Sequence, residues 1–360
     1  MQKEIARSSI EAKLKKIVDS SVKSSNTFLL IHSDKLDIHW NMAFGQSDKE
    51  HAIPEQPYHT ASIAKSFTAA IIAILVEEGK LTYSDPITKY LPATLLEGLH
   101  TYKGTDYSSD IRIEHLVSNT SGLADYFEGK TRHGQFTEVL LNDPKRVWTP
   151  EETIEWTKQY LPPRFSPGNG TLYTNTGFNL LGLVIENVTS KSYHEVLHEY
   201  LFQRLNMEQS YLSHYTEPLV KSPLSVAKLS VMGKQIDVEE HLSFTSIFAA
   251  GQAVSTSEDL LKFIKALNEN RLVPKEHVAQ MMQWKKMRVG IDYGYGLMRV
   301  RMFLFSQKYN VWGHLGSMGS FMLYNPGLDV YLVGSFNKAG STGPCIRFLF
   351  HVLRTLEKCD

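Results

Sequence analysis

The sequence predicts an α/β protein in which helices flank an antiparallel sheet and a helical region is inserted between the two parts of that sheet. A helix and two strand-like runs begin the chain, proline-punctuated helical segments fill its middle, and strand-like runs followed by a helix end it. Because both ends contribute strands, we expect them to share one sheet. The predicted α/β sheet domain comprises residues 1–80 and 250–360, and residues 81–249 form a mainly helical inserted domain.

The first part of the sheet domain follows from the spacing of apolar residues. Residues 8–24 carry them at helical intervals, which predicts an amphipathic helix. Strands are expected at Thr27–His32 and Leu36–Phe44, with a turn at residues 33–35 between them. Residues 63–79 are rich in alanine and isoleucine, and an uninterrupted apolar run of this kind predicts a buried helix.

The last part of the chain alternates strand and turn signals. Ser257–Asn268 is a predicted helix for which Ser257 could be the N-cap. From about residue 293 the pattern turns to strands, separated by turn residues after Tyr324 and after Phe336. The expected strands are Gly296–Phe305, Tyr309–His314, Ser320–Tyr324 and Val330–Phe336, and a helix over about 344–358 closes the chain.

Composition excludes several classes of function. The 360 residues include 38 Lys+Arg and 38 Asp+Glu, so the formal net charge is zero and nothing indicates an electrostatic nucleic-acid or membrane binder. No run reaches the roughly 18 apolar residues that a membrane-spanning helix needs. The two cysteines, Cys345 and Cys359, lie in one predicted helix and cannot pair, and no spacing fits a zinc site. The oligomeric state stays open.

The N-terminus bears on the compartment. Residues 1–7 are charged and lack an apolar segment, so they do not form a signal peptide. The sequence as it stands therefore predicts a cytoplasmic protein, and an exported protein whose signal peptide has been removed is the alternative.

Ser62 and Lys65, at the start of the predicted buried helix, form the first chemical motif. A serine hydroxyl is a poor nucleophile unless a base lies beside it. Three residues are nearly one helical turn, so the Lys65 amine is expected beside the Ser62 hydroxyl in an S-x-x-K arrangement. The same spacing also occurs at Ser20/Lys23, Ser225/Lys228 and Ser335/Lys338, so other motifs must single out Ser62.

Tyr173-Thr-Asn175 is the second motif, and no other Tyr-x-Asn occurs in the chain. A phenol beside an ammonium group has a lowered pKa and can relay protons. The amide of Asn175 can hold both a lysine and a substrate carbonyl.

The third motif is Gly313-His-Leu-Gly-Ser-Met-Gly319, between two strand-like runs. A glycine such as Gly316 at a strand edge lets a substrate approach closely. The backbone N–H of Ser317, together with that of Ser62, could stabilise an oxyanion. His314 could donate a hydrogen bond or, if protonated, attract a substrate carboxylate.

In this order the three motifs resemble those of the serine β-lactamase-like superfamily. The branch they resemble contains class C β-lactamases, D-alanyl-D-alanine carboxypeptidases and related esterases. Ile113–Leu123, Phe248–Leu260 and Tyr293–Leu297 are similar to further segments of that branch, so the resemblance covers about residues 25–340.

Three features depart from the branch. Asn119 stands where its loop usually has a histidine, and His314 stands where lactamases usually have a lysine. Residues 99–110 look like an additional loop. Histidine at the third motif is more typical of the carboxypeptidases, so these departures weaken a lactamase assignment.

The resemblance implies a β-lactamase/transpeptidase-like fold and a serine hydrolase that forms an acyl-enzyme on an amide or ester carbonyl. It favours a penicillin-binding D-alanyl-D-alanine carboxypeptidase-like peptidase. The alternatives are a β-lactamase or small-ester esterase and a non-catalytic penicillin-binding or sensor protein. A small molecule or peptide is the expected substrate, with no metal or organic cofactor. The implied catalytic residues are Ser62, Lys65 and Tyr173, and the implied substrate-binding residues are Asn175, His314, Gly316 and Ser317.

Overall fold

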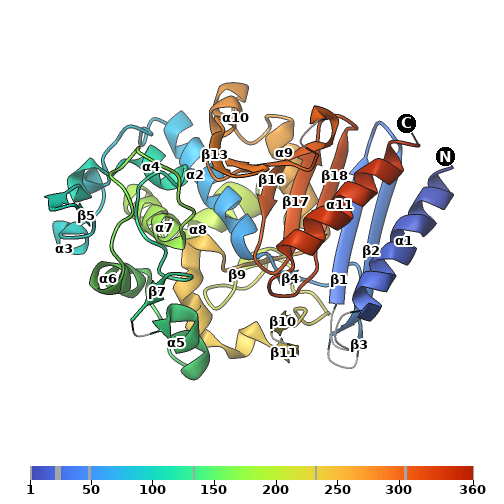
Figure 1. Cartoon of the computed structure of the whole chain (residues 1–360), viewed down its shortest axis with the longest axis horizontal. Helices are drawn as coiled ribbons and strands as arrows, with labels where there is room; N and C mark the ends of the chain where they lie inside the picture. The colour runs from blue at the N-terminus through green and yellow to red at the C-terminus, as the bar shows by residue number, and fades with distance from the viewer. Residues whose placement is uncertain are drawn as a thin grey trace.

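An antiparallel sheet of nine strands runs through the described part of the chain (Figure 1). The computed structural model describes residues 2–20, 26–47, 50–132, 134–231, 233–303 and 306–359. From one edge to the other, the strands are β13 (Lys285–Arg288), β14 (Ile291–Tyr293), β15 (Met298–Arg301), β16 (Asn310–Leu315), β17 (Ser320–Asn325), β18 (Val330–Ser335), β1 (Asn26–Ser33), β2 (Ile38–Ser47) and β3 (Glu50–His51).

Strands from the two ends of the chain meet inside this sheet. β1 pairs with β18 in antiparallel register, with Leu30 opposite Val333, and it pairs with β2 on its other side. All residues of β18 are buried, as expected of an apolar strand covered on both faces. The prediction that the ends of the chain share one antiparallel sheet flanked by helices is therefore confirmed.

Helices cover both faces of the sheet. α1 (Lys3–Ser20) packs against β2 and against α11 (Thr342–Leu356). α9 (Ser257–Asn268) packs against β1, β17 and β18. In Figure 1, α1 and α11 lie in front of the sheet and α9 lies behind it. The sheet is thus the middle of three layers.

The helix α2 (Ala64–Glu77) joins the sheet region to the helical region. It packs against α7 (Asn175–Thr189), α8 (Tyr193–Leu197) and the 3₁₀ segment η6 (Leu242–Ala250). Every residue from Ala64 to Leu75 is buried, which confirms the buried helix expected at residues 63–79. The other α-helices are α3 (Ala93–Leu96), α4 (Ile113–Val117), α5 (Phe136–Asn142), α6 (Pro150–Tyr160) and α10 (Lys275–Met281).

The chain between β3 and β13 contains several short strands that lie outside the nine-stranded sheet. β12 (Ala253–Ser255) lies between β4 (Tyr58–His59) and β9 (Tyr211–Leu212) in a small antiparallel sheet. The others form two-stranded pairs: β5 (Thr101–Tyr102) with β6 (Thr105–Asp106), β7 (Lys130–Thr131) with β8 (Gly134–Gln135), and β10 (Leu229–Val231) with β11 (Lys234–Ile236).

Several expected boundaries are wrong. Thr256, and not Ser257, is the N-cap of α9, because its hydroxyl accepts a hydrogen bond from the N–H of Asp259. The edge strand β13 and its neighbour β14 were not predicted. β15 is shorter than the strand expected at Gly296–Phe305, whose last two residues lie outside the described part. The end of the helix expected at residues 8–24, with Lys23, also lies outside it.

The extra segment at residues 99–110 forms the β5–β6 hairpin, with Lys103 and Gly104 both at positive φ in its turn. The division of the chain at residues 80 and 250 into two domains stays a prediction.

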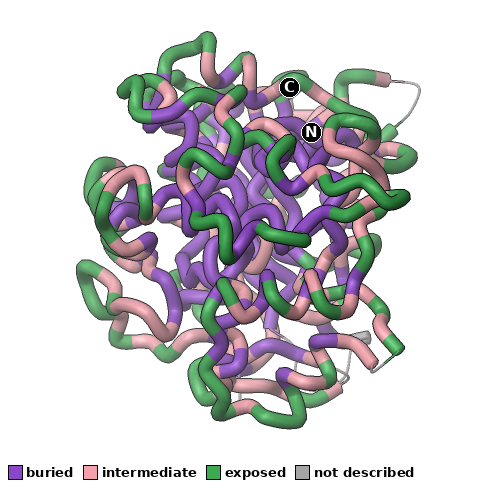
Figure 2. Tube along the Cα trace, turned by 90° about the vertical axis from the view of Figure 1, so that its left-hand side faces the viewer, coloured by how far each residue is buried: buried purple, intermediate pink, exposed green. Residues whose placement is uncertain are grey.

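Buried residues are concentrated in the interior of the molecule, and exposed segments surround them (Figure 2). A single apolar cluster joins Leu30 of the sheet, Ile71 of α2 and Leu181 of α7. A smaller cluster in the helical region contains Tyr126, Phe136 and Trp148. Across the described residues, the structure contains no helix with the length and apolar character needed to span a bilayer.

Candidate active site

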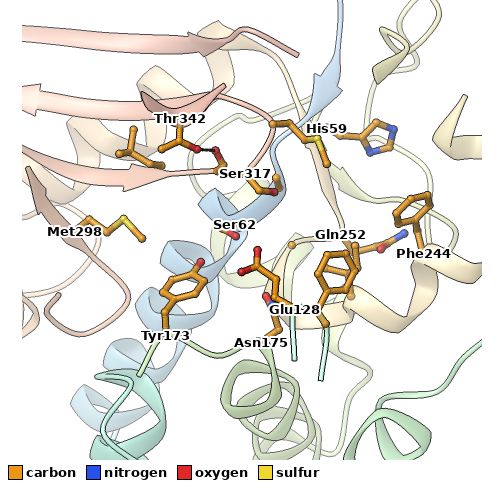
Figure 3. A pocket seen from close by; sticks show the side chains of 18 of the residues that line it. His59, Ser62, Glu128, Tyr173, Asn175, Phe244, Gln252, Met298, Ser317 and Thr342 are labelled. Atoms are coloured by element: carbon orange, nitrogen blue, oxygen red, sulfur yellow. Dashed lines mark hydrogen bonds between the residues drawn. The ribbon is translucent and has the colours of Figure 1, made fainter. Parts of the chain in front are cut away.

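A cavity of about 430 Å³ opens where the start of α2, the end of β16 and the helical region meet. It is lined by five of the seven predicted site residues, namely Ser62, Tyr173, Asn175, Gly316 and Ser317 (Figure 3). These residues come from segments far apart in the sequence, so the cavity brings the three motifs together.

Ser62 lies in a single 3₁₀ turn, η1 (Ala61–Ile63), directly before α2. The preceding residue, Ala61, has a φ of 49°, a left-handed conformation that a non-glycine residue rarely adopts. Neighbouring structure holds this turn in place: the Thr60 N–H donates to Ala253 O at 2.9 Å, and Ser320 Oγ donates to Thr60 O at 2.7 Å. The strained turn presents the Ser62 hydroxyl to the cavity.

Lys65 is fully buried beneath Ser62. Its Nζ lies 2.6 Å from Asn175 Oδ1, 2.6 Å from the backbone carbonyl oxygen of Ala250 and 3.4 Å from Ser62 Oγ. Burial lowers the pKa of Lys65 to about 7, although the carboxylates of Asp125 and Glu128 oppose this shift. A large fraction of Lys65 is therefore uncharged at neutral pH.

Tyr173 covers the other side of Lys65. The lysine Nζ lies 5.0 Å from the centre of the tyrosine ring. The Tyr173 hydroxyl is buried, and no hydrogen bond of ordinary geometry reaches it within the described chain. Burial raises the pKa of Tyr173, and the nearby Ser62 hydroxyl opposes this rise only in part. The phenol is thus protonated in the resting site and free to form a new hydrogen bond.

Asp125 holds Asn175 in place through hydrogen bonds, and the sequence did not predict this role. Its Oδ1 accepts hydrogen bonds from Asn175 N at 2.8 Å and from Asn175 Nδ2 at 3.0 Å. Burial raises the pKa of Asp125, and the N–H groups of Asn175 and Glu128 and the charge of Lys65 oppose the rise. One signal was available: Asp125 is the only charged residue in the run Leu123–Phe127.

His314 is buried and does not line the cavity. Its Nδ1 is 2.8 Å from the Leu315 carbonyl oxygen, so Nδ1–H donates there and Nε2 accepts from the Tyr293 hydroxyl at 3.3 Å. Burial and the nearby Lys65 lower the pKa of His314 to about 3. His314 is thus neutral near pH 7, and the geometry gives it a packing and hydrogen-bonding place behind Tyr173.

Asn119, the residue in place of the usual histidine, holds the backbone around Tyr173. Its backbone oxygen accepts from Leu172 N at 2.9 Å, and its Oδ1 accepts from Thr174 N at 3.1 Å. Its φ of 57° is left-handed, a conformation that asparagine tolerates better than most residues. Asn119 therefore positions Tyr173 from both sides.

Gly316 and Ser317 directly follow β16 and line the cavity. A Cβ on Gly316 would lie 2.1 Å from Ser320 Oγ, so a larger residue here would displace the hydroxyl that donates to Thr60 O. Within the described residues, neither the N–H of Ser317 nor that of Ser62 donates to a backbone carbonyl. Both N–H groups are available to an oxygen bound in the cavity. Thr342, which also lines the cavity, donates from Oγ1 to Gly316 O at 3.3 Å (Figure 3).

The rest of the lining is mostly apolar, with two charged residues, Glu128 and Arg288. None of residues 99–110 lines the cavity. In the described residue ranges, no group of three or more His, Cys, Asp or Glu side chains is arranged to hold a metal ion.

This fold and this constellation of serine, lysine, tyrosine and asparagine define a serine hydrolase of the penicillin-recognising kind. A family model described as Beta-lactamase matches residues 27–350. Because the match covers most of the chain, the protein belongs to the Beta-lactamase family.

One curated relative and two solved structures illustrate the membership. Penicillin-binding protein 4* of Bacillus subtilis (strain 168) is 25% identical over 279 residues, 72% of this chain and 56% of that protein, so the chain spans little more than half the length of this relative. The D-stereospecific amidohydrolase from Streptomyces sp. is 25% identical with a TM-score of 0.79, over 94% of this chain and 97% of that one.

The D-amino acid amidase from Ochrobactrum anthropi SV3, solved with D-phenylalanine, has a TM-score of 0.81 at 21% identity and covers 99% of both chains. At that identity it supports the fold alone. Together these likenesses confirm the predicted β-lactamase/transpeptidase-like fold.

Proposed function

We propose that this protein hydrolyses an amide bond of a small peptide or amino-acid amide through an acyl-enzyme on Ser62. Its membership in the family and the amidohydrolase named above support this reaction class. The observation that carries the proposal is the set of partners around Lys65.

A neutral amine has two N–H donors and one lone pair. Two of the three polar neighbours of Lys65, Asn175 Oδ1 and Ala250 O, can only accept hydrogen bonds. When Lys65 is uncharged, its two N–H groups donate to them, and its lone pair is left for the Ser62 hydroxyl at 3.4 Å. This arrangement supports Lys65 as the general base.

The chemical steps follow from this arrangement. Lys65 takes the Ser62 proton as Ser62 Oγ forms a bond to the substrate carbonyl carbon. The N–H groups of Ser62 and Ser317 stabilise the oxyanion. The Tyr173 hydroxyl gives its proton to the leaving amine and regains one from Lys65, so the carbon–nitrogen bond breaks. Water then attacks the ester, transfers a proton through Tyr173 and releases the acid and free Ser62.

A carboxypeptidase acting on D-alanyl-D-alanine ends is the second candidate. Such a substrate carries a terminal carboxylate, which calls for a cation in the cavity. Because His314 is neutral and does not line the cavity, Arg288 is the residue that supports this candidate, since it lines the cavity from β13. β-Lactam or small-ester hydrolysis by the same machinery remains an alternative reaction.

Covalent labelling tests the proposal. Wild-type protein is incubated with a fluorophosphonate and, separately, with a fluorescent penicillin, and its intact mass is measured. We expect one adduct with the fluorophosphonate, none on Ser62→Ala, and an unchanged adduct on Ser317→Ala, because Ser317 contributes only its backbone. Absence of an adduct on the wild type, or its persistence on Ser62→Ala, overturns the mechanism.

A donor panel then separates the candidates. Amino-acid amides, a D-Ala-D-Ala peptide, nitrocefin and p-nitrophenyl acetate are assayed with wild type and Ser62→Ala. Amide turnover that exceeds ester and lactam turnover supports the proposed function. Preference for the D-Ala-D-Ala peptide, lost in Arg288→Gln, supports the carboxypeptidase.

A further inference from the structure

Among the described residues, Glu128 provides the only carboxylate that lines the active-site cavity. Figure 3 shows it turned into the cavity, on the same side as Ser62 and Tyr173. Within the described residues, no hydrogen bond or ion pair satisfies this carboxylate in the resting site. Most of the remaining lining is apolar and includes Phe127, Phe244, Ile247 and Met298.

The backbone of Glu128 is held in place. Its N–H donates to Asp125 Oδ2 at 3.0 Å, and its carbonyl oxygen accepts from Gln135 Nε2 at 3.3 Å. The turn closes with Gly129 N donating to Asp125 O at 2.9 Å, and a Cβ on Gly129 would lie 2.4 Å from that same oxygen. Asp125 therefore holds the backbone of Glu128 and the side chain of Asn175. The position of Glu128 thus depends on the same carboxylate that orients Asn175 beside Lys65.

Charges around Glu128 leave it without a compensating partner. Burial and the Asp125 carboxylate raise its pKa, whereas Lys65 and Arg288 lower it. Lys65 is substantially uncharged near pH 7. Arg288 lines the same cavity, but within the described chain no ion pair joins it to Glu128. The Glu128 side chain keeps solvent contact at the cavity, so its carboxylate is hydrated in the resting site and can form a charge-assisted hydrogen bond to a cation that enters the cavity.

We propose that Glu128 binds a positively charged ammonium group of the substrate, beside the carbonyl that Ser62 attacks. This inference rests on the proposed function and specifies its substrate class: amides and peptides whose acyl part carries a free amino group. The apolar lining at Phe244 and Ile247 fits an apolar or aromatic side chain on the same acyl part.

Three matched amides test the proposal. Phenylalanine amide, in both stereochemical forms, carries the ammonium group; its N-acetyl derivative and 3-phenylpropionamide lack that charge and keep the ring. We expect the wild type to prefer the better phenylalanine amide form over both analogues by at least about tenfold in kcat/KM, the effect of a charge-assisted hydrogen bond. Equal turnover of the three amides overturns the inference.

Substitution locates the effect. Glu128→Gln should lower kcat/KM for phenylalanine amide by about 10- to 100-fold while changing that for 3-phenylpropionamide less than about twofold. Glu97→Gln, which removes an exposed carboxylate at the end of α3 outside the cavity lining, is the matched control and should change neither. An equal loss on both amides in Glu128→Gln contradicts ammonium binding.

Covalent labelling distinguishes a failure of ammonium binding by Glu128 from a failure of acyl-enzyme formation on Ser62. Glu128→Gln should still react with the fluorophosphonate at Ser62, which shows that the site is folded. If the wild type labels and hydrolyses amides without preferring the free amine, only the role of Glu128 fails. If the wild type does not label, the proposed function fails first. A Glu128→Lys variant should reverse the preference and favour an amide whose acyl part carries a carboxylate, such as succinamic acid.

Discussion

The Asp125 carboxylate sets the direction in which the Asn175 side-chain amide faces. Asn175 Nδ2 donates to Asp125 Oδ1 at 3.0 Å, and the amide oxygen on the other side accepts from Lys65 Nζ at 2.6 Å. An asparagine amide turned the other way would aim its NH₂ group at the Lys65 N–H groups. The carboxylate thus selects the orientation in which Lys65 donates and keeps its lone pair for Ser62.

Removing the Asp125 charge should therefore change both the rate and its pH dependence. We expect Asp125→Ala to lower kcat by about 10- to 100-fold, since a hydrogen bond to a charged group contributes about 1.5–3 kcal/mol. Because Asp125 raises the pKa of Lys65, Asp125→Asn should also move the acid limb of kcat/KM to lower pH. Asp110→Asn, at an exposed position, is the control. An unmoved limb in Asp125→Asn argues for a purely structural role.

The lowered pKa of Lys65 predicts how the activity of the wild type depends on pH. The base form is the neutral amine, and burial lowers the pKa of this group to about 7. kcat/KM should therefore rise as the pH increases through about 7 and level off above it. Initial rates on a saturable amide from pH 5 to 9 measure this limb. A rate that is flat or falls from pH 6 to 8 contradicts Lys65 as the base.

Tyr173→Phe should separate catalysis from stability. The variant keeps the ring over Lys65 and removes a hydroxyl that has no hydrogen-bond partner in the described resting site. We expect acylation to slow by about 10²–10⁴-fold, the usual contribution of a positioned acid–base group. Thermal denaturation should show no loss of Tm, because the removed hydroxyl is buried and unsatisfied. A large drop in Tm with little change in acylation reverses this assignment.

Asn119 supplies a test of how Tyr173 is positioned. Asn119→Ala removes the acceptor for Thr174 N and places a methyl side chain at a left-handed φ of 57°. We expect a loss of about 1–3 kcal/mol in the free energy of unfolding from the unsatisfied buried N–H. Asn119→Gly loses the same bond without the backbone strain, so it should be more stable than Asn119→Ala by roughly 1 kcal/mol. Urea unfolding of both variants measures the difference, and equal stabilities would show that φ is not limiting.

Local sequence patterns determined many of the helices and strands of this protein. Apolar spacing predicted α1 and α2, and alternating strand and turn signals predicted β1, β2 and β16 to β18, because these features depend on residues a few positions apart. The spacing of Ser62 and Lys65 placed both at the start of α2 for the same reason. The edge strand β13 was not predicted because two of its four residues are lysines, and its neighbour β14 was not predicted because it has only three residues.

The sequence by itself predicted the reaction class, from a serine and a lysine one helical turn apart, a Tyr-x-Asn, and a glycine-bordered strand end, in that order. Only the tertiary structure decided the charge states of these residues and which side chains line the cavity. Lys65 meets Asn175 from 110 residues away and Ala250 from 185 residues away, and burial by those distant segments lowers its pKa. The same long-range packing buries His314 and places Glu128 in the cavity lining, because both outcomes depend on distant neighbours that no local pattern specifies.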